Sequence, residues 1–377
     1  MADAHTDVVT AGPPLDTGKR LVLALSRVWA WVFLVCLVLF FTISVSATSD
    51  GVINFVSLRN SQNILLTITP VVLMGLGQTF VIISGGIDLS VGWVMGLSSV
   101  MSATVTVDLV GRGVGEVEAI VLGFVAGVLV AMLFGAINGA IIARLGVPSF
   151  IVTLGISFVA RGVALIISGG NVVSGLPDGV RNFGNEAMFY VVPGEGGGVS
   201  LLNKPEVSGA ALRGMDRVFQ WPVVVATITV FILGFVLART QFGRHTYAIG
   251  GSRMASLRAG VPVDRMTILI YTLSALTAGI AGCLHTARFN GGSGIAGEPL
   301  LLSSIAAVII GGVSMFGGRG NVTGTVIGAL IIAILVTGLI LLGVDPYWQF
   351  IIIGIVVILA VLIDQARDVI AGRAEAS

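Results

Sequence analysis

The segment RTQFGRHTYAIGGSRMASLRAGVPVDR, residues 239–265, is a basic stretch enclosed by two apolar ones. It carries five arginines and a single acidic residue, Asp264. The flanking stretches, 222–238 and 266–288, are long enough as helices to cross a hydrocarbon core of roughly 30 Å. Positive charge between two membrane spans is typical of a cytoplasmic loop. The segment therefore orients the chain, and it is the natural place for a soluble partner to bind.

The composition of the whole chain is that of a membrane protein. Hydrophobic residues make up 55% of the 377 residues and charged residues only 10%, whereas a soluble domain carries about a quarter charged residues. Backbone amides in lipid need internal partners, so the spans must be helices or a closed barrel. Long apolar runs without strict alternation favour helices, and we expect an all-α polytopic membrane protein. The net charge of +1 gives no indication of nucleic-acid binding.

About ten transmembrane helices are predicted from the apolar runs. Basic residues precede the first run, which places the N-terminus in the cytoplasm, and alternation then places 239–265 and the C-terminus on the same side. Most of the 20 Lys and Arg residues fall on that side, as the positive-inside rule requires. The predicted spans are 29–48, 62–84, 89–108, 119–143, 149–168, 222–238, 266–288, 300–313, 322–342 and 347–363.

The chain divides into one membrane domain with short tails. We expect a disordered cytoplasmic tail over 1–28, the membrane domain over 29–365 and a second cytoplasmic tail over 366–377. The external loop, 169–221, mixes Gly, Pro, Asn and charges of both signs, and it lacks the apolar pattern of a separate core. It is expected to form an ordered cap or docking surface outside the membrane.

A polar interruption, SGGIDLSVG at 84–92, breaks an otherwise apolar region. Its glycine pair frees the backbone from helical geometry. Asp88 then lies at or near membrane depth, and Ser90 is placed to cap the helix that follows. One interpretation is a broken helix that lines a solute path. The other is a structural cap in which nearby backbone amides satisfy Asp88, and the residues alone leave both open.

Three further polar side chains lie on predicted spans. Gln78 and Asn138 carry amides, which more often join membrane helices than bind a ligand. Arg161 is placed to contact a polar solute or to pair with Asp88 or Asp345, but extension along its own stem to the outer interface is favoured. With Asp88 and Ser90, these residues are the candidates for a substrate pathway.

The chain offers no candidate for catalysis or for a metal site. Cys36 and Cys283 lie in apolar runs without metal-like spacing, and we expect buried, inert thiols. Three histidines are too few for a catalytic triad with suitable neighbours. A P-loop pattern is absent from the sequence. The chain is therefore not expected to be an enzyme or to bind a cofactor, and any ATP hydrolysis would belong to another polypeptide.

A short helix is predicted inside the basic segment. Ser252 is a suitable N-cap, Gly260 is a suitable stop, and Pro262 prevents continuation.

The predicted helix has an apolar ridge with arginines beside it. Met254, Leu257 and Val261 follow helical spacing, while Arg253 and Arg258 stand off that face. This arrangement fits a groove on a partner protein, and it fits the lipid headgroups equally well.

Four stretches together resemble the permease subunits of bacterial ABC importers for ribose, xylose and related simple sugars. They occur in the family's order and spacing between about residues 60 and 365, and the combination is highly specific although each one alone is weak. The stretches are GLGQTFVIISGGIDLSVG at 75–92, GAINGAIIARLGVPSFIVTLG at 135–155, FGRHTYAIGGSRMASLRAGV at 242–261 and SIAAVIIGGVSMFGGRGNVTGTVIGALI at 304–331.

The resemblance implies a type II ABC importer-like permease in the bacterial inner membrane that moves a monosaccharide or similar small polar solute inward. It implies three partners: a separate ATPase subunit that holds ATP and Mg²⁺, an extracytoplasmic sugar-binding protein, and a second permease subunit, expected to be a copy of this chain. The family's coupling helix lies in the loop that matches 242–261. The ATPase contact candidates carried over to this chain are Ile249, Gly250, Gly251, Ser252, Arg253, Met254, Leu257, Arg258 and Gly260.

The sequence also departs from the family's pattern. An acidic pair that often precedes the IAA motif is replaced by Leu301, Leu302 and Ser303, and an often Asn-rich segment reads Val-Thr-Gly-Leu-Ile at 336–340. These losses put the substrate in doubt, though not the architecture.

Two other functions fit parts of the sequence. An ion-coupled secondary transporter would use Asp88 and Arg161, because transporters often bind ions at broken helices. A membrane scaffold without transport activity would use the basic segment alone.

Overall fold

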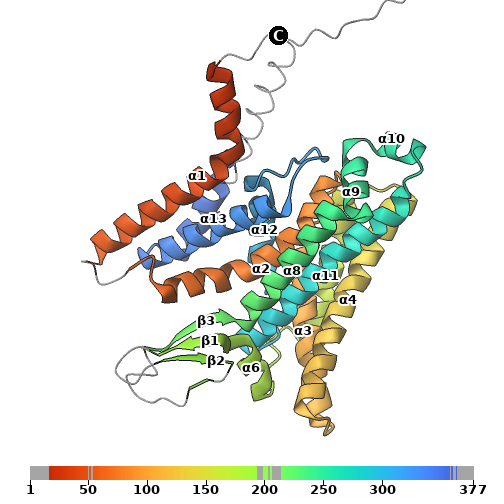
Figure 1. Cartoon of the computed structure of the whole chain (residues 1–377). Helices are drawn as coiled ribbons and strands as arrows, with labels where there is room; N and C mark the ends of the chain where they lie inside the picture. The colour runs from red at the N-terminus through yellow and green to blue at the C-terminus, as the bar shows by residue number, and fades with distance from the viewer. Residues whose placement is uncertain are drawn as a thin grey trace, which may run out of the picture.

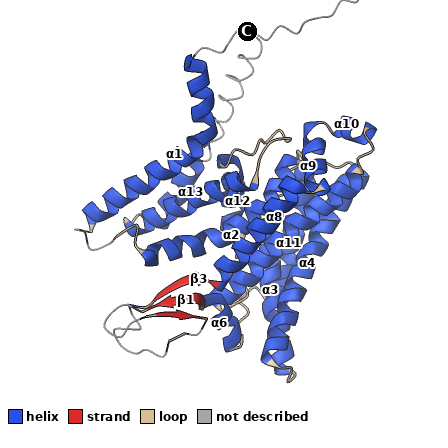
Figure 2. Ribbon diagram, viewed as in Figure 1, coloured by secondary structure: helices blue, strands red, loops and turns tan. Residues whose placement is uncertain are grey.

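The computed structural model describes residues 17–49, 51, 54–192, 198–202, 204–205, 214–356, 358–359 and 362, with side chains from residue 30 onward. The chain is a bundle of long helices with a small β-sheet at one end (Figures 1 and 2). The long helices are α1 (Thr17–Thr48), α2 (Leu58–Ile83), α3 (Val91–Gly111), α4 (Glu116–Leu145), α5 (Ser149–Ser168), α8 (Trp221–Arg239), α11 (Val263–Phe289) and α13 (Val322–Leu341).

Within the described residues, eight helices are long and apolar enough to cross a membrane, where ten spans were predicted. The other two predicted spans contain shorter apolar helices, α12 (Glu298–Ile310) and Pro346–Val356. At 1.5 Å per residue, α12 covers about 20 Å, which is less than the hydrocarbon thickness. Helix α1 begins at Thr17, so the last part of the predicted N-terminal tail is helical. Residues 1–16 and the predicted tail at 366–377 lie outside the described residues.

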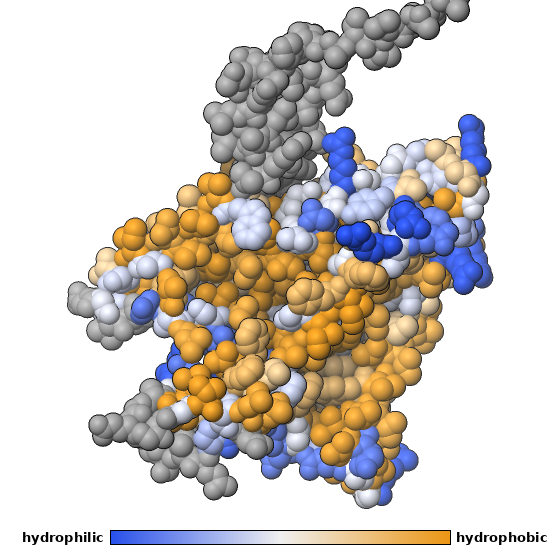
Figure 3. Space-filling model, viewed as in Figure 1, coloured by the Kyte–Doolittle hydropathy of each residue, from blue (hydrophilic) through white to orange (hydrophobic). Residues whose placement is uncertain are grey.

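The helices divide into a buried centre and an apolar periphery. Among the candidate spans, α2, α11 and α13 are mostly buried, while at most 28% of the residues in the membrane-crossing windows of α1, α4, α5 and α8 are buried. Figure 3 shows the result: apolar residues form a broad band across the middle of the visible face, with polar residues gathered toward its two ends. Such a band is what a lipid-facing surface requires.

Helices α4 and α11 pack closely because α4 carries small residues on its buried face. Gly135 and Gly139 lie against α11, and Gly123 and Gly127 allow the same close approach to α3. A Cβ at Gly139 would lie 2.5 Å from the Cα of Ile268 on α11, so a larger residue would push the helices apart. Small residues of this kind allow the close backbone approach that joins membrane helices.

The predicted external loop contains an ordered cap. It comprises α6 (Asp178–Asn185) and a three-stranded antiparallel sheet in the order β2 (Val199–Leu201), β1 (Ala187–Val191), β3 (Asp216–Gln220). Gly184 of α6 packs directly on the backbone of Ala287 near the end of α11. Arg59 at the start of α2 pairs with Asp216 of β3 at 3.3 Å. The cap is therefore attached to the helical bundle, as expected for a surface that is not a separate domain.

The basic segment lies at the opposite end of the bundle from the sheet (Figure 1). It forms two helices, α9 (Gln241–Gly251) and α10 (Arg253–Arg258), where one was predicted. The predicted helix is confirmed as α10, since the hydroxyl oxygen of Ser252 accepts a hydrogen bond from the Ala255 amide at 3.2 Å. Gly260 follows with φ +80°, the left-handed conformation that ends many helices.

Candidate functional site

The chain leaves helical geometry between α2 and α3, at residues 84–90. Helix α2 ends in a Schellman motif, in which Gly85 adopts φ +81° and its amide donates to the Ile82 carbonyl at 2.9 Å. The Gly86 amide donates to the Val81 carbonyl at 2.9 Å in the same turn. The glycine pair therefore ends the helix as predicted, and it directs the chain into a short extended segment.

Asp88 lies at the centre of this segment and is fully buried, with 0% of its surface exposed. One carboxylate oxygen accepts from the Ser90 amide at 2.9 Å and from the Ser90 hydroxyl at 2.6 Å. The other accepts from the Ser274 hydroxyl of α11 at 2.8 Å. Among the described residues, no Lys or Arg pairs with this carboxylate. Asp88 is thus satisfied by neutral donors.

The predicted capping role of Ser90 is wrong. Ser90 occupies the N-cap position of α3, but its side chain makes no capping hydrogen bond there. Its hydroxyl oxygen instead accepts from the Asn138 side-chain amide at 2.9 Å, and its proton is donated to the buried Asp88 carboxylate.

Gln78 and Asn138 complete the cluster around Asp88. The Gln78 side-chain amide donates to the backbone carbonyl of Asp88, and the Asn138 amide donates to the Ser90 hydroxyl oxygen at 2.9 Å. Both side chains are fully buried, and their amide oxygens have no hydrogen-bond partner among the described residues. Four of the five predicted pathway residues therefore lie together, and they join α2, α3 and α4.

Helix α5 supports the same segment with two hydroxyls that were not predicted. The Ile87 amide donates to the Ser149 hydroxyl oxygen at 3.3 Å, and the Leu89 amide donates to the Thr153 hydroxyl oxygen at 3.1 Å. Ser149 and Thr153 are four residues apart and so share one face of the helix. That spacing is the only sequence signal for this contact, and it is a weak one.

Arg161 lies apart from the cluster. Its guanidinium carbon is 4.5 Å from the ring centroid of Trp93, a cation–π geometry, and the side chain is exposed. Within the described part of the chain it forms no ion pair with Asp88 or Asp345. Pairing with an acid was the less favoured of the two interpretations, and the guanidinium instead lies over an aromatic ring of α3.

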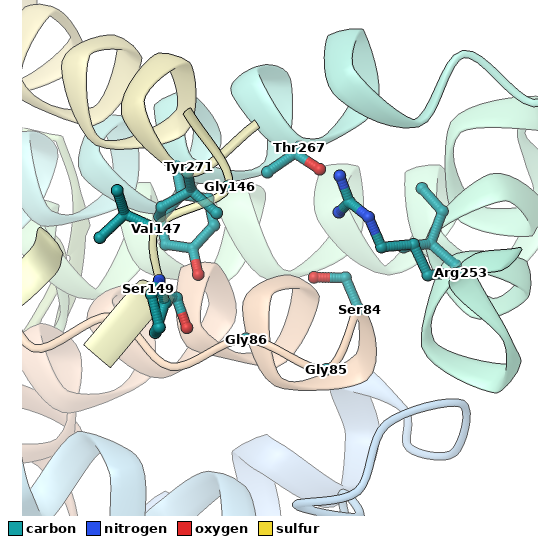
Figure 4. Close-up of a pocket in the computed structure, with 12 residues that line it drawn as sticks. Ser84, Gly85, Gly86, Gly146, Val147, Ser149, Arg253, Thr267 and Tyr271 are labelled. Atoms are coloured by element: carbon teal, nitrogen blue, oxygen red, sulfur yellow. The ribbon is translucent and has the colours of Figure 1, made fainter. Parts of the chain in front are cut away.

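A cavity of about 290 Å³ reaches the segment from the α9–α10 end of the bundle (Figure 4). Ser84, Gly85 and Gly86 form one wall. Arg253 of α10 extends into the cavity toward Thr267 of α11, as Figure 4 shows. The remaining lining residues are Ile142, Gly146, Val147, Pro148, Ser149, Ile249 and Tyr271.

The predicted ATPase contacts divide into buried and exposed groups. Ile249 is only 5% exposed and belongs to the bundle core, and Gly250 packs against the end of α2. Met254 and Leu257 are 61% and 48% exposed, although both are large and apolar. The other exposed candidates are Gly251, Ser252, Arg253, Arg258 and Gly260.

The two cysteines differ in environment. Cys283 of α11 is buried, as expected, but Cys36 is exposed on α1, because that helix lies at the periphery of the bundle. Among the described residues, no three His, Cys, Asp or Glu side chains gather in a way that could hold a metal ion.

Comparison with known proteins identifies relatives that cover most of the chain. The family model described as "Branched-chain amino acid transport system / permease component" matches residues 60–361. The ribose import permease protein of Bacillus subtilis is 36% identical over 315 residues, which are 84% of this chain and 87% of the relative. The fructose import permease protein of Rhizobium meliloti is 37% identical over 369 residues, 97% of this chain and 93% of the relative.

A third relative is the D-allose transport system permease protein of Escherichia coli, 34% identical over 311 residues, 82% of this chain and 85% of the relative. No solved structure matches significantly. The chain therefore belongs to the family of permease components that includes these sugar importers, as its four motifs predicted.

Proposed function

We propose that this chain is the membrane subunit of an ABC importer and that it moves a monosaccharide, or a similar small polar solute, into the cell. The observation that carries the proposal is the similarity over 97% and 84% of the chain to import permeases for fructose and ribose. The multiple apolar helices fit a multi-pass protein of the bacterial inner membrane. The charge distribution favours a cytoplasmic location for both termini.

Helix α10 is the proposed docking site for a separate ATPase subunit that binds ATP and Mg²⁺. Its exposed Met254 and Leu257 form an apolar ridge, and Arg258 adds positive charge beside it, whereas Arg253 pairs with Asp264 at 3.3 Å. Because α10 lies at the end of the bundle opposite the cap, an ATPase bound there would leave the cap free for an extracytoplasmic sugar-binding protein (Figure 1). A second copy of the chain would complete the transport pathway.

The cluster of Gln78, Asp88, Ser90 and Asn138 has a supporting role in this proposal. Its side chains are fully or almost fully buried and largely satisfied by one another, so they are suited to hold the non-helical segment in one shape beside the solute path. Arg161 is suited to stabilise the α3–α5 contact through Trp93.

The importer is preferred over an ion-coupled transporter on the position of two residues. That mechanism needs Asp88 and Arg161 to act together, whereas Arg161 contacts Trp93 and Asp88 is surrounded by neutral donors. A scaffold without transport activity gives no reason for a buried polar cluster at the break between two spans.

The test is reconstitution. The tagged chain is purified with the ATPase subunit that co-isolates with it, the pair is inserted into vesicles, and candidate sugar-binding proteins are added outside. Uptake of radiolabelled D-ribose, D-fructose and D-allose is then measured with and without ATP in the compartment that holds the ATPase. ATP-dependent uptake of one sugar supports the proposal. Uptake that follows an ion gradient without ATP, or no uptake by an assembled complex, refutes it.

A further inference from the structure

At Gly250, helix α9 meets the last residue of α2 through backbone atoms. At Gly250 an added Cβ would overlap the carbonyl oxygen of Ile83, the last residue of α2, and would lie 2.6 Å from the amide nitrogen of Gly318. There is no room for any side chain at this position. Gly251, the next residue, has nothing within 4 Å of its Cβ position. The close approach is therefore specific to one residue of α9.

The loop at 311–320, between α12 and α13, joins the same contact. The Gly318 amide donates to the Ile83 carbonyl at 2.8 Å and so satisfies one of the carbonyls that the end of α2 leaves free. Gly317 and Gly318 adopt φ +86° and +73°, which only glycine adopts readily. A Cβ at Gly317 would lie 2.9 Å from the Gly250 carbonyl oxygen. Three chain segments thus meet at one point without side chains between them.

A hydrogen bond links α9 to the 311–320 loop about one turn before Gly250. The Tyr247 hydroxyl donates to the Gly320 carbonyl oxygen at 2.7 Å. Burial raises the pKa of the Tyr247 phenol, so the hydroxyl remains a donor at neutral pH. Tyr247 and Gly250 are three residues apart and lie on the same face of α9. That face is fixed to the bundle, whereas α10 directly after it is exposed.

The contact is close in sequence to the buried cluster. Ile83 is followed by the turn at 84–86 and then by Asp88, whose bonds to Ser90 and Ser274 fix its position. Because the turn is hydrogen-bonded throughout, a displacement of Ile83 has little flexible chain in which to be absorbed. The α9–α10 segment also lines the cavity of about 290 Å³, through Ile249 and Arg253, together with the turn at 84–86.

We propose that Gly250 and Tyr247 form the mechanical link through which movement of α10 reaches the Asp88 segment and the 311–320 loop together. This inference rests on the proposed function, since it takes a bound ATPase to be what moves α10. The backbone contact at Gly250 suits the role because it contains no side-chain rotamers that could absorb a displacement. Gly250 and Tyr247 are positioning residues, and they need not touch either the solute or ATP.

The test uses the reconstituted complex with Gly250→Ala, and with Gly111→Ala as the control. Gly111 ends α3 near the opposite end of the bundle and has nothing within 4 Å of its Cβ position. Gly250→Ala should still bind the ATPase subunit and hydrolyse ATP, but the amount of sugar moved per ATP should fall about ten-fold. Gly111→Ala should match the unmodified chain in both measurements.

A second variant covers the case in which Gly250→Ala does not fold. Tyr247→Phe keeps the ring and removes only the bond to Gly320, and it should lower sugar moved per ATP about three-fold with ATPase association unchanged. Hydrogen exchange at residues 314–320 should accelerate in the same variant. Unchanged transport per ATP and unchanged exchange in Tyr247→Phe, or unchanged transport in a folded Gly250→Ala complex, overturn the inference. Failure of the unmodified complex to transport with ATP would instead refute the proposed function.

Discussion

Replacing Asp88 by Asn and by Ala separates what its hydrogen bonds contribute from what its charge contributes. The side-chain oxygen of Asn can accept from the Ser90 amide and hydroxyl, as Asp88 does. The side-chain NH₂ of Asn can donate to the Ser274 hydroxyl oxygen, and the Ser274 proton then turns to another acceptor. Ala removes the acceptor altogether. Three buried donors then lose their partner, at about 1–3 kcal/mol for each one that finds no other.

The expected difference between the two variants follows from that count. Both hydroxyls, of Ser90 and Ser274, can turn toward another acceptor in either variant. This leaves one unpaired donor, the Ser90 amide, in the Ala variant and a difference of about 2 kcal/mol in the free energy of unfolding between Asn and Ala. Asn and Ala are both neutral, so the difference in stability between the two variants does not include the cost of burying the Asp88 charge.

Reversible unfolding in mixed detergent, followed by tryptophan fluorescence, measures this difference. Asp108→Ala is the control, because Asp108 is half-exposed and pairs only with Arg112 one turn away, a contact worth about 0.5 kcal/mol. If both variants are as stable as the unmodified chain, the hydrogen bonds of Asp88 contribute nothing. If both are destabilised to the same extent, the negative charge itself is required, which is the outcome expected of a bound cation.

Three further predictions concern other parts of the chain. Leu257→Asp should abolish ATPase association while leaving membrane insertion intact, because it puts a charge on the exposed ridge of α10. Co-purification of the ATPase subunit measures this association, and normal association would reject the docking role of α10. Gly139→Leu should lower the yield of folded protein recovered by size-exclusion chromatography in detergent, since the leucine side chain would meet α11. The leucine of Gly162→Leu would enter open space and should leave this yield unchanged. Equal yields of the two variants would contradict the packing argument. Arg161→Ala should cost about 1 kcal/mol of stability, whereas Trp93→Leu should cost more because Trp93 also packs in the core. In the Trp93→Leu background, Arg161→Ala should cost little further; fully additive losses would show that the two side chains do not interact.

The sequence was informative where long patterns decide the structure. The membrane helices follow from apolar runs, and α10 follows from Ser252 and Gly260, because caps and stops depend on local residues. The two short apolar helices were harder to distinguish from membrane spans, since an apolar run shows that a segment avoids water but not that it extends across the membrane. Glu298–Ile310 is apolar because it packs inside the bundle, mainly against α2 and α13.

The site was only partly predictable because its hydrogen bonds join distant parts of the chain. Asp88 and Asn138 stood out as polar residues in apolar stretches. Ser274, Ser149 and Thr153 did not, because hydroxyls are common in membrane helices and often bond their own backbone. Which hydroxyl faces Asp88 depends on how α11 and α5 are rotated, and helix rotation is set by packing rather than by local sequence.

The three strands of the cap were missed for a different reason. They are short, they lie in a segment rich in glycine and in charges of both signs, and β1 must pair with strands on either side of it before its own residues are satisfied. Pairing of that kind is determined by register and loop closure, for which a single sequence carries little signal.

Helix α11 connects the two ends of the molecule as one piece. It starts directly after α10 at Val263 and ends at Phe289, beside the point where Gly184 of the cap packs on Ala287. Its 27 residues are about 40 Å long and include no proline. A tilt of about 5° would move its far end by about 3 Å, since a continuous helix works as a lever arm. A protein that binds the cap and a protein that binds α10 therefore act on the same continuous helix. If the cap ligand changes the affinity of α10 for its partner by some factor, the α10 partner must change the affinity of the cap for its ligand by the same factor.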